Sequence, residues 1–278
     1  MFFATAIMLG AAVVSCEKTP SSKNGNKDNN GDDDTPTETI AIDGNFADWD
    51  ACTTAVTATL PEGTKEKAEL KAIKFTSDAD YIYCYAEFGN HLKSFEGVDP
   101  KWDGNTWAGS GIPTNITFFI DTDANPKTGM VYREVGPFSK IGFEVACELY
   151  QFIAVETGQP TLAWSQCNYW DPTEEWAKDA EDGDEYLWPP YMWGTDNKGN
   201  RDNTLVVKGD YKAKVEGLTI KLECAISRDA LYEVQGKDKV NISVLFFGWD
   251  GEPNTHKTEL MGFLPQGGDN EYVTLNLK

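Results

Sequence analysis

The sequence predicts an all-β fold from residue 40 onward, a two-sheet antiparallel β-sandwich of the jelly-roll-like kind. Segments rich in Val, Ile, Tyr, Phe and Thr recur between Gly, Asp, Asn or Pro, which is typical of strands. Several of these segments alternate apolar and polar residues, as residues 81–88 do, and this indicates sheets with differently exposed faces. No stretch keeps a helical periodicity over three turns.

The strand pattern gives nine predicted strands and one short helical turn. The strands are expected at 70–76, 80–88, 114–120, 141–155, 204–208, 211–215, 217–226, 240–249 and 271–277. The helical turn is expected at 227–232, with Ser227 as its N-terminal cap. The length of the chain after residue 39 suits one large all-β domain or two small ones, and we expect residues 40–278 to form a single domain.

The first 39 residues predict targeting and tethering. Residues 2–14 are apolar, about as long as the core of a signal peptide and too short to span a bilayer. They end in Val13-Val14-Ser15-Cys16, which resembles a bacterial lipobox. The resemblance implies a signal peptide at 1–15 and a lipid on Cys16; a chance cysteine after an apolar segment is the alternative. Residues 16–39 are polar and are expected to form a disordered tether.

The signal-like segment has one departure from the usual pattern. No Lys or Arg precedes the apolar run, so a start upstream of Met1 stays open. The acidic run at residues 32–34 is similar to the export tags of Bacteroidetes surface lipoproteins, but it lies far from Cys16, and a solvated charge run is the favoured alternative. With the lipobox, this similarity implies a lipid-anchored outer-membrane protein at the cell surface. The lipid would be its only membrane contact.

The charge and the rare residue types exclude several functions. A net charge of −21 argues against nucleic acid and favours cations and neutral ligands such as sugars. Five cysteines remain after Cys16, without a CxxC pair, so the spacing shows neither a disulfide framework nor a zinc motif. Cys84, Cys147 and Cys224 lie in apolar strands and are predicted to be small core residues.

Catalysis finds little support in the sequence. The only two histidines, His91 and His256, lie in polar contexts, and no nucleophile elbow or zinc-protease helix is present. Pairs of carboxylates could hydrolyse glycosides, but with 45 acidic residues some pair is always present. We therefore expect that the protein is not an enzyme.

A turn after the apolar strand that ends at Ile120 is a candidate cation site. Asp121, Asp123 and Asn125 occupy every second position, as ligands do at the start of an EF-hand loop. The rest of an EF-hand is absent, because Pro126 and Tyr132 replace its glycine and its glutamate.

Two interpretations of this turn remain open. Glu144, on the next predicted strand, is the candidate fourth ligand, and together the four residues would hold a structural Ca²⁺. A purely structural turn without a bound ion is given the same weight as the calcium site. Lys127 favours the structural turn, because its charge neutralises part of the cluster.

Residues 156–203 are predicted to be a long, ordered and acidic insertion, because disordered loops lack tryptophan. Flat aromatic rings beside carboxylates are what a sugar-binding site needs. The candidate ligand-binding residues are Trp170, Trp176, Trp188, Tyr191 and Trp193, with a second group at Trp102 and Trp107. These rings could equally form a small core under the loop.

Three blocks of sequence resemble family 9 carbohydrate-binding modules and related DOMON-like sandwiches. They are Ile42-Asp43-Gly44 with Trp49, the segment 76–86, and the turn 120–129. The resemblance covers the first half of the fold and implies a β-sandwich with frequent calcium and often glycan binding. Without the resemblance, Trp49 is predicted to be a core anchor.

These observations favour one function and leave two alternatives. The leading hypothesis is a non-catalytic glycan-binding surface lipoprotein that captures a polysaccharide or oligosaccharide on Trp and Tyr rings, and that could feed an outer-membrane uptake complex. The first alternative is an envelope adhesion or protein-interaction module with the same fold. The second, and the least favoured, is a glycoside hydrolase.

Overall fold

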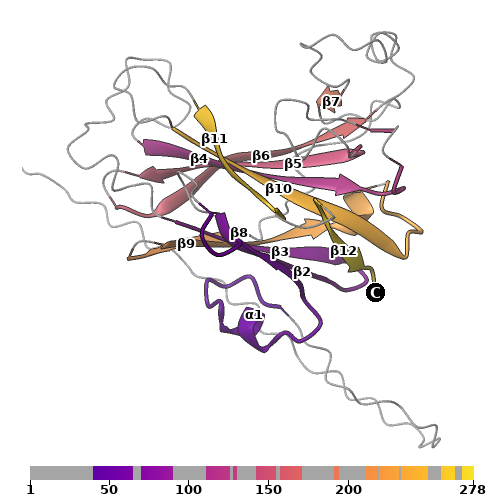
Figure 1. Ribbon diagram of the computed structural model, residues 1–278, viewed down its shortest axis with the longest axis horizontal. Helices are drawn as coiled ribbons and strands as arrows, with labels where there is room; N and C mark the ends of the chain where they lie inside the picture. The colour runs from indigo at the N-terminus through magenta and orange to yellow at the C-terminus, as the bar shows by residue number, and fades with distance from the viewer. Residues whose placement is uncertain are drawn as a thin grey trace, which may run out of the picture. The chain divides into compact units, whose positions relative to one another are not determined.

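The chain is an all-β sandwich. The computed structural model describes residues 40–64, 70–89, 111–125, 128–129, 142–154, 157–170, 191–193, 211–217, 219–231, 233–249, 258–266 and 271–278. One compact unit runs from Glu38 to Lys278. Two antiparallel sheets pack against each other in it (Figure 1), which confirms the predicted two-sheet sandwich.

The first sheet has five strands in the order β1-β2-β3-β9-β8. Their bounds are β1 Val56–Thr59, β2 Leu70–Ser77, β3 Tyr81–Gly89, β9 Thr219–Ser227 and β8 Tyr211–Glu216. Neighbouring strands are consecutive in the chain except at one place, where β3 pairs with β9. That ladder therefore joins the N-terminal and C-terminal parts of the sheet.

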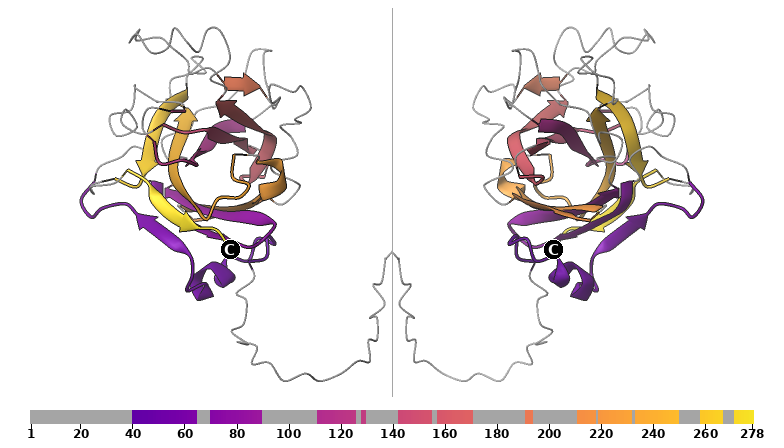
Figure 2. Two further views of the ribbon diagram at one scale, coloured as in Figure 1. Left: turned by 90° about the vertical axis from the view of Figure 1, so that its right-hand side faces the viewer. Right: turned by 90° about the vertical axis from the view of Figure 1, so that its left-hand side faces the viewer.

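The second sheet has seven strands and carries both candidate sites. Six follow in the order β11-β10-β4-β5-β6-β7, and β12 pairs with β10. Their bounds are β4 Gly111–Asp121, β5 Val145–Ala154, β6 Pro160–Trp170, β7 Tyr191–Trp193, β10 Lys239–Trp249, β11 Thr258–Leu264 and β12 Val273–Asn276. Figure 2 shows the two sheets curving around a shared interior.

Several elements differ from the sequence-based expectation. The segment 156–203, predicted to be an insertion, contributes β6 and β7 to the sheet, so much of its described part is integral to the fold. Strands β1 and β11 were not predicted. A 3-10 helix forms at Arg228–Ala230 as expected, but the Ser227 side chain makes no capping hydrogen bond to it. The predicted strand 204–208 lies outside the described residues.

The core fills the space between the two inner faces. Phe75 of β2 meets Phe118 of β4 edge-on, with ring centroids 6.0 Å apart, and Phe88 of β3 packs on Phe246 of β10 at 4.5 Å. Each fully buried Phe side chain stabilises the fold by roughly 1.5–3 kcal/mol. The predicted small core residues Cys84, Cys147 and Cys224 belong to this cluster, as expected from their apolar strands.

The N-terminal segment covers the outer face of the five-stranded sheet. Helix α1, Ala47–Ala51, lies outside that sheet (Figure 1) and carries Trp49, which is 1% exposed. Trp49 packs with Ile40, Phe46 and Tyr85. It is therefore a core anchor, as predicted, but of a second cluster outside the sandwich interior. None of the helices in the described residues is long and apolar enough to cross a bilayer.

A buried carboxylate attaches this segment to the sheet. Glu223 of β9 accepts hydrogen bonds from the Gly44 N–H at 2.7 Å and from Trp49 Nε1 at 3.0 Å. Burial raises the pKa of Glu223, whereas the hydrogen bonds from Gly44 and Trp49 lower it. The two oxygens of one side chain thus hold the turn and the indole together.

We expect Glu223→Gln to lower the free energy of unfolding by about 1–3 kcal/mol, because it replaces one of the two accepting oxygens by an NH2 group, which can only donate. Urea unfolding measures the change. Glu216→Gln is the matched control, since Glu216 lies on the same sheet and is partly exposed beside Lys214 and Lys221. Its loss should be much smaller, because exposed ion pairs contribute little to stability. Equal losses in the two variants would contradict the role assigned to Glu223.

Candidate functional site

The turn after β4 is built around the carboxylate of Asp121. Its Oδ1 accepts hydrogen bonds from the backbone N–H of Asp123 at 3.1 Å and of Ala124 at 2.7 Å. Its Oδ2 accepts from Asn241 Nδ2 on β10 at 2.9 Å. The side chain of Asp121 therefore closes the turn and fixes it to the neighbouring strand.

Asp123 continues the same arrangement one step along the turn. Its Oδ1 accepts from the Asn125 N–H at 2.8 Å, and its Oδ2 accepts from Thr128 Oγ1 at 2.8 Å. Between the two aspartates, Ala124 has a φ of 55°, which is unusual for a residue with a side chain. The surrounding hydrogen bonds hold the backbone in this left-handed conformation.

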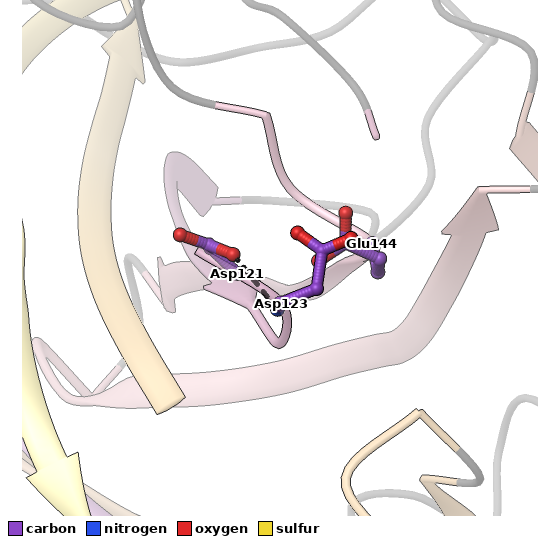
Figure 3. A group of neighbouring side chains, drawn as sticks. All are labelled: Asp121, Asp123 and Glu144. Carbon is purple, nitrogen blue, oxygen red and sulfur yellow. Dashed lines mark hydrogen bonds between the residues drawn. The ribbon is translucent and has the colours of Figure 1, made fainter. Parts of the chain in front are cut away.

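Glu144 meets this turn from the other side, directly before β5. Its Oε2 accepts from the Thr122 N–H at 2.7 Å and from Thr122 Oγ1 at 3.2 Å. Its Oε1 is buried and has no hydrogen-bond partner. In Figure 3 the carboxylates of Asp123 and Glu144 point toward one another. An acceptor that is desolvated without a partner is unfavourable unless a proton or a cation reaches it.

Two glycines allow the chain to close around Glu144. A Cβ atom on Gly129 would lie 2.5 Å from the Phe143 carbonyl oxygen and 2.6 Å from Glu144 Oε1. A Cβ atom on Gly142 would lie 1.6 Å from the Thr128 carbonyl oxygen. All three distances are far below a van der Waals contact, so the chain can approach this closely only with glycine at both positions.

The cluster is electrostatically unfavourable in the absence of a cation. One oxygen from each of Asp121, Asp123 and Glu144 lies within 4.8 Å of the others. Burial raises the pKa of Glu144 to about 7, and the charges of Asp123 and Asp121 add to the rise against the hydrogen bonds from Thr122. Among the described residues, this is the one group of three or more carboxylates, thiols or imidazoles close enough together to hold a metal ion.

The arrangement fits a hard cation such as Ca²⁺. All three donors are carboxylate oxygens, and Glu144 Oε1 lacks the partner that a cation would supply. The structure thus brings three of the four predicted ligands together. Asn125 lies exposed in the same turn, and its backbone N–H bonds to Asp123. Thr122, which donates two hydrogen bonds to Glu144, was not predicted, because the spacing of the acidic residues gives no sign of it.

A second candidate site is an aromatic face of the seven-stranded sheet. In the backbone register, Tyr150 of β5 is opposite Trp164 of β6. Trp170 of β6 is in turn opposite Tyr191 of β7, and Trp193 is opposite Asn168. Positions 164, 168 and 170 alternate along β6, so they share one face of the sheet with their cross-strand partners. We call these five aromatic residues, Tyr150, Trp164, Trp170, Tyr191 and Trp193, the aromatic face.

The aromatic face is the side of the sheet that points away from the sandwich core. Val145, Cys147 and Leu149 belong to the core cluster, and they occupy the positions between those of the outer face on β5. The same face carries polar positions, with Glu148 opposite both Thr117 and Gln166. Asn115, opposite Tyr150, has a buried Oδ1 without a hydrogen-bond partner. In the backbone register, aromatic and amide positions thus share one face of the sheet.

Sequence reasoning located part of this face. Trp170, Tyr191 and Trp193 were predicted as ligand-binding residues, and the register brings them together. Trp164, Tyr150 and Asn115 were not predicted; the even spacing between Trp164 and Trp170, which places both on one face of a strand, was the available signal. The other predicted residues, Trp102, Trp107, Trp176, Trp188 and the lipidation site Cys16, lie outside the described residues.

We expect Gly129→Ala to lower the free energy of unfolding by about 3 kcal/mol, because the added methyl group meets the Phe143 backbone and the Glu144 carboxylate. Gly236→Ala is the matched control, since Gly236 has a similar φ of 72° but no atom within 4 Å of its Cβ position. It should lose only about 1 kcal/mol from backbone strain. Denaturant unfolding of both variants measures the difference; equal losses would disprove the close approach.

We also expect the metal-free protein to lose stability as the pH rises. The pKa of Glu144 is about 7 in the folded state, above its ordinary value of 4.5. Its protonated form is therefore favoured by folding, and the contribution is full below about pH 4.5 and lost as the pH passes 7. In chelator, Glu144→Gln should remove on the order of 1–2 kcal/mol of the pH dependence of unfolding. Identical pH profiles of the two proteins would refute this.

Comparison with known proteins leaves the family open. No protein-family model matches the chain, and no curated protein matches it. A solved structure from Bacteroides uniformis, described as a "putative carbohydrate-binding protein", is similar with a TM-score of 0.39 and 9% identity. The match covers 87% of this chain and 94% of that one. A similarity at this level does not bear on what the chain binds.

Proposed function

We propose that this protein is a non-catalytic glycan-binding module that captures a polysaccharide or oligosaccharide on the aromatic face. The supporting observation is the register of β5, β6 and β7, which collects five aromatic residues on the side of the sheet away from the core. Amide and carboxylate positions lie among them, at Asn115, Glu148 and Gln166.

This composition suits a pyranose ring. The C–H face of a sugar stacks on an aromatic ring, and the burial of apolar surface supplies affinity. Hydroxyl groups need acceptors and donors at fixed positions, which set specificity. Asn115 Oδ1 is a buried acceptor without a partner, and a sugar hydroxyl could donate to it.

We further propose that the turn after β4 binds a structural Ca²⁺ through Asp121, Asp123 and Glu144, with Asn125 as a further ligand. The ion would offset the repulsion among the carboxylates and supply the partner that Glu144 Oε1 lacks. Glu144 precedes Val145, which pairs with Tyr169, the neighbour of Trp170. The ion would therefore also order the end of the sheet that carries Trp170 and Tyr191.

The proposed role is glycan capture at the outer membrane. The lipobox-like segment at Cys16 would anchor the chain, residues 16–39 would hold the sandwich off the membrane, and the captured glycan could pass to an uptake complex. A negative net charge of −21 suits a neutral ligand better than an acidic one.

Calcium should raise the melting temperature of the chelator-treated protein. With one bound ion, a free concentration of 100 times the Kd adds about 2.7 kcal/mol of stability. Glu144→Gln and Asp123→Asn should each weaken this calcium response at least tenfold in half-saturating concentration. Asp238→Asn, which changes an exposed carboxylate elsewhere, should keep it. If neither calcium nor EDTA changes the melting temperature of the unaltered protein, the calcium proposal is wrong.

Glycan binding should depend on the aromatic face. In affinity electrophoresis against a panel of neutral polysaccharides, Trp164→Ala and Trp170→Ala should each weaken retardation about tenfold. Tyr81→Ala, on the other sheet, is the aromatic control and should bind normally. Circular dichroism confirms that each variant is folded. If no polysaccharide or oligosaccharide binds the unaltered protein, the adhesion or protein-interaction module with the same fold becomes the better hypothesis.

A further inference from the structure

Two cysteines of the five-stranded sheet face each other across neighbouring strands. Cys84 of β3 and Cys224 of β9 are directly opposite in the antiparallel register. Both point into the sandwich core, with exposures of 1% and 0%. The structure has both as thiols. Their spacing in the sequence gave no sign of this relation, because β3 and β9 lie far apart in the chain.

The position of the pair in the ladder sets the distance between the two backbones. The Arg228 N–H donates to the Asp80 carbonyl oxygen at 2.8 Å, and these two residues continue the β3–β9 register. Hydrogen-bonded pairs recur at every second residue, so Cys84 and Cys224 form such a pair. Their Cα atoms are then about 5.5 Å apart, inside the range of roughly 4.4–6.8 Å that disulfides bridge.

The same relation occurs a second time in the other sheet. Cys147 of β5 is directly opposite Cys167 of β6. Four of the five cysteines that follow Cys16 are therefore placed in cross-strand pairs, and Cys52 is the remaining one. An odd number of cysteines, which argued against a disulfide framework, is compatible with pairing once the register is known.

We propose that Cys84 and Cys224 are a disulfide site, closed while the chain folds in contact with a disulfide oxidant. The oxidant is an oxidised dithiol protein or a small-molecule disulfide. One thiolate attacks the oxidant to form a mixed disulfide, and the second thiolate displaces it. Two thiols lose two protons and two electrons, and the oxidant is reduced to two thiols. The reaction precedes the burial of both sulfur atoms, because the folded core excludes the oxidant.

This bond would strengthen the one discontinuous ladder of the five-stranded sheet. Strands β1, β2 and β3 come from the beginning of the domain, and β8 and β9 come from its last third. A crosslink across so long a separation removes much conformational freedom from the unfolded chain, and its stabilising effect grows with the length of the closed loop.

The test is a disulfide map of the full chain after refolding. The reduced, denatured protein is refolded with reduced and oxidised glutathione, alkylated and digested with trypsin. Peptides 75–93 and 222–228 each carry one of the two cysteines, so their linked product identifies the bond by mass spectrometry. We expect this linked product in the folded protein. Recovery of both peptides in alkylated form, or linkage of either to Cys147, overturns the proposal.

A thermal measurement gives an independent result. Protein refolded with oxidised glutathione should melt about 5–10 °C above the same protein refolded in reductant. The variant Cys84→Ala with Cys224→Ala should lose this dependence on redox conditions. Cys52→Ser, which changes the cysteine outside both pairs, should keep it. A redox-independent melting temperature in the unaltered protein speaks against the bond, and the peptide map remains decisive if the double variant does not fold.

Discussion

The sandwich depends on the burial of two apolar sheet faces against each other. Phe75 and Phe118 meet at this interface, as do Phe88 and Phe246. The inner faces stabilise the fold, so the outer faces are not needed for the main core. The outer faces of the two sheets differ. The N-terminal segment covers the five-stranded sheet through Trp49. The seven-stranded sheet instead carries the aromatic face and, at the end of β4, the carboxylate turn.

Strands with clear alternation could be predicted from sequence, and strands without it could not. The alternating run that forms β3 was placed within one residue of its bounds. Strand β6 was missed because Ser165, Gln166 and Asn168 make it polar, and its apolar positions do not alternate. It forms because β5 provides a complete ladder beside it, a tertiary effect that no local window contains. Strand β1, with four residues, is too short to give a pattern.

The candidate cation site was predictable because its ligands follow a local rule, namely acidic side chains at alternate positions of a turn. The turn 120–129 contained that rule, and the structure adds the contact with Glu144. Glu223 was beyond prediction, since a glutamate in an alternating strand normally faces water. Only the tertiary position of Trp49 and Gly44 makes it a buried acceptor. Likewise, the pairing of cysteines depends on a register that is set by the whole sheet.

The β3–β9 ladder limits how early the protein can fold during its synthesis on the ribosome. In the sequence, β3 and β9 are separated by β4 to β7 of the seven-stranded sheet and by β8. The five-stranded sheet therefore cannot close until most of the polypeptide has been synthesised, and domains with such distant contacts fold slowly. Until β9 has been synthesised, β3 lacks its partner strand and the apolar inner face of this sheet stays incomplete.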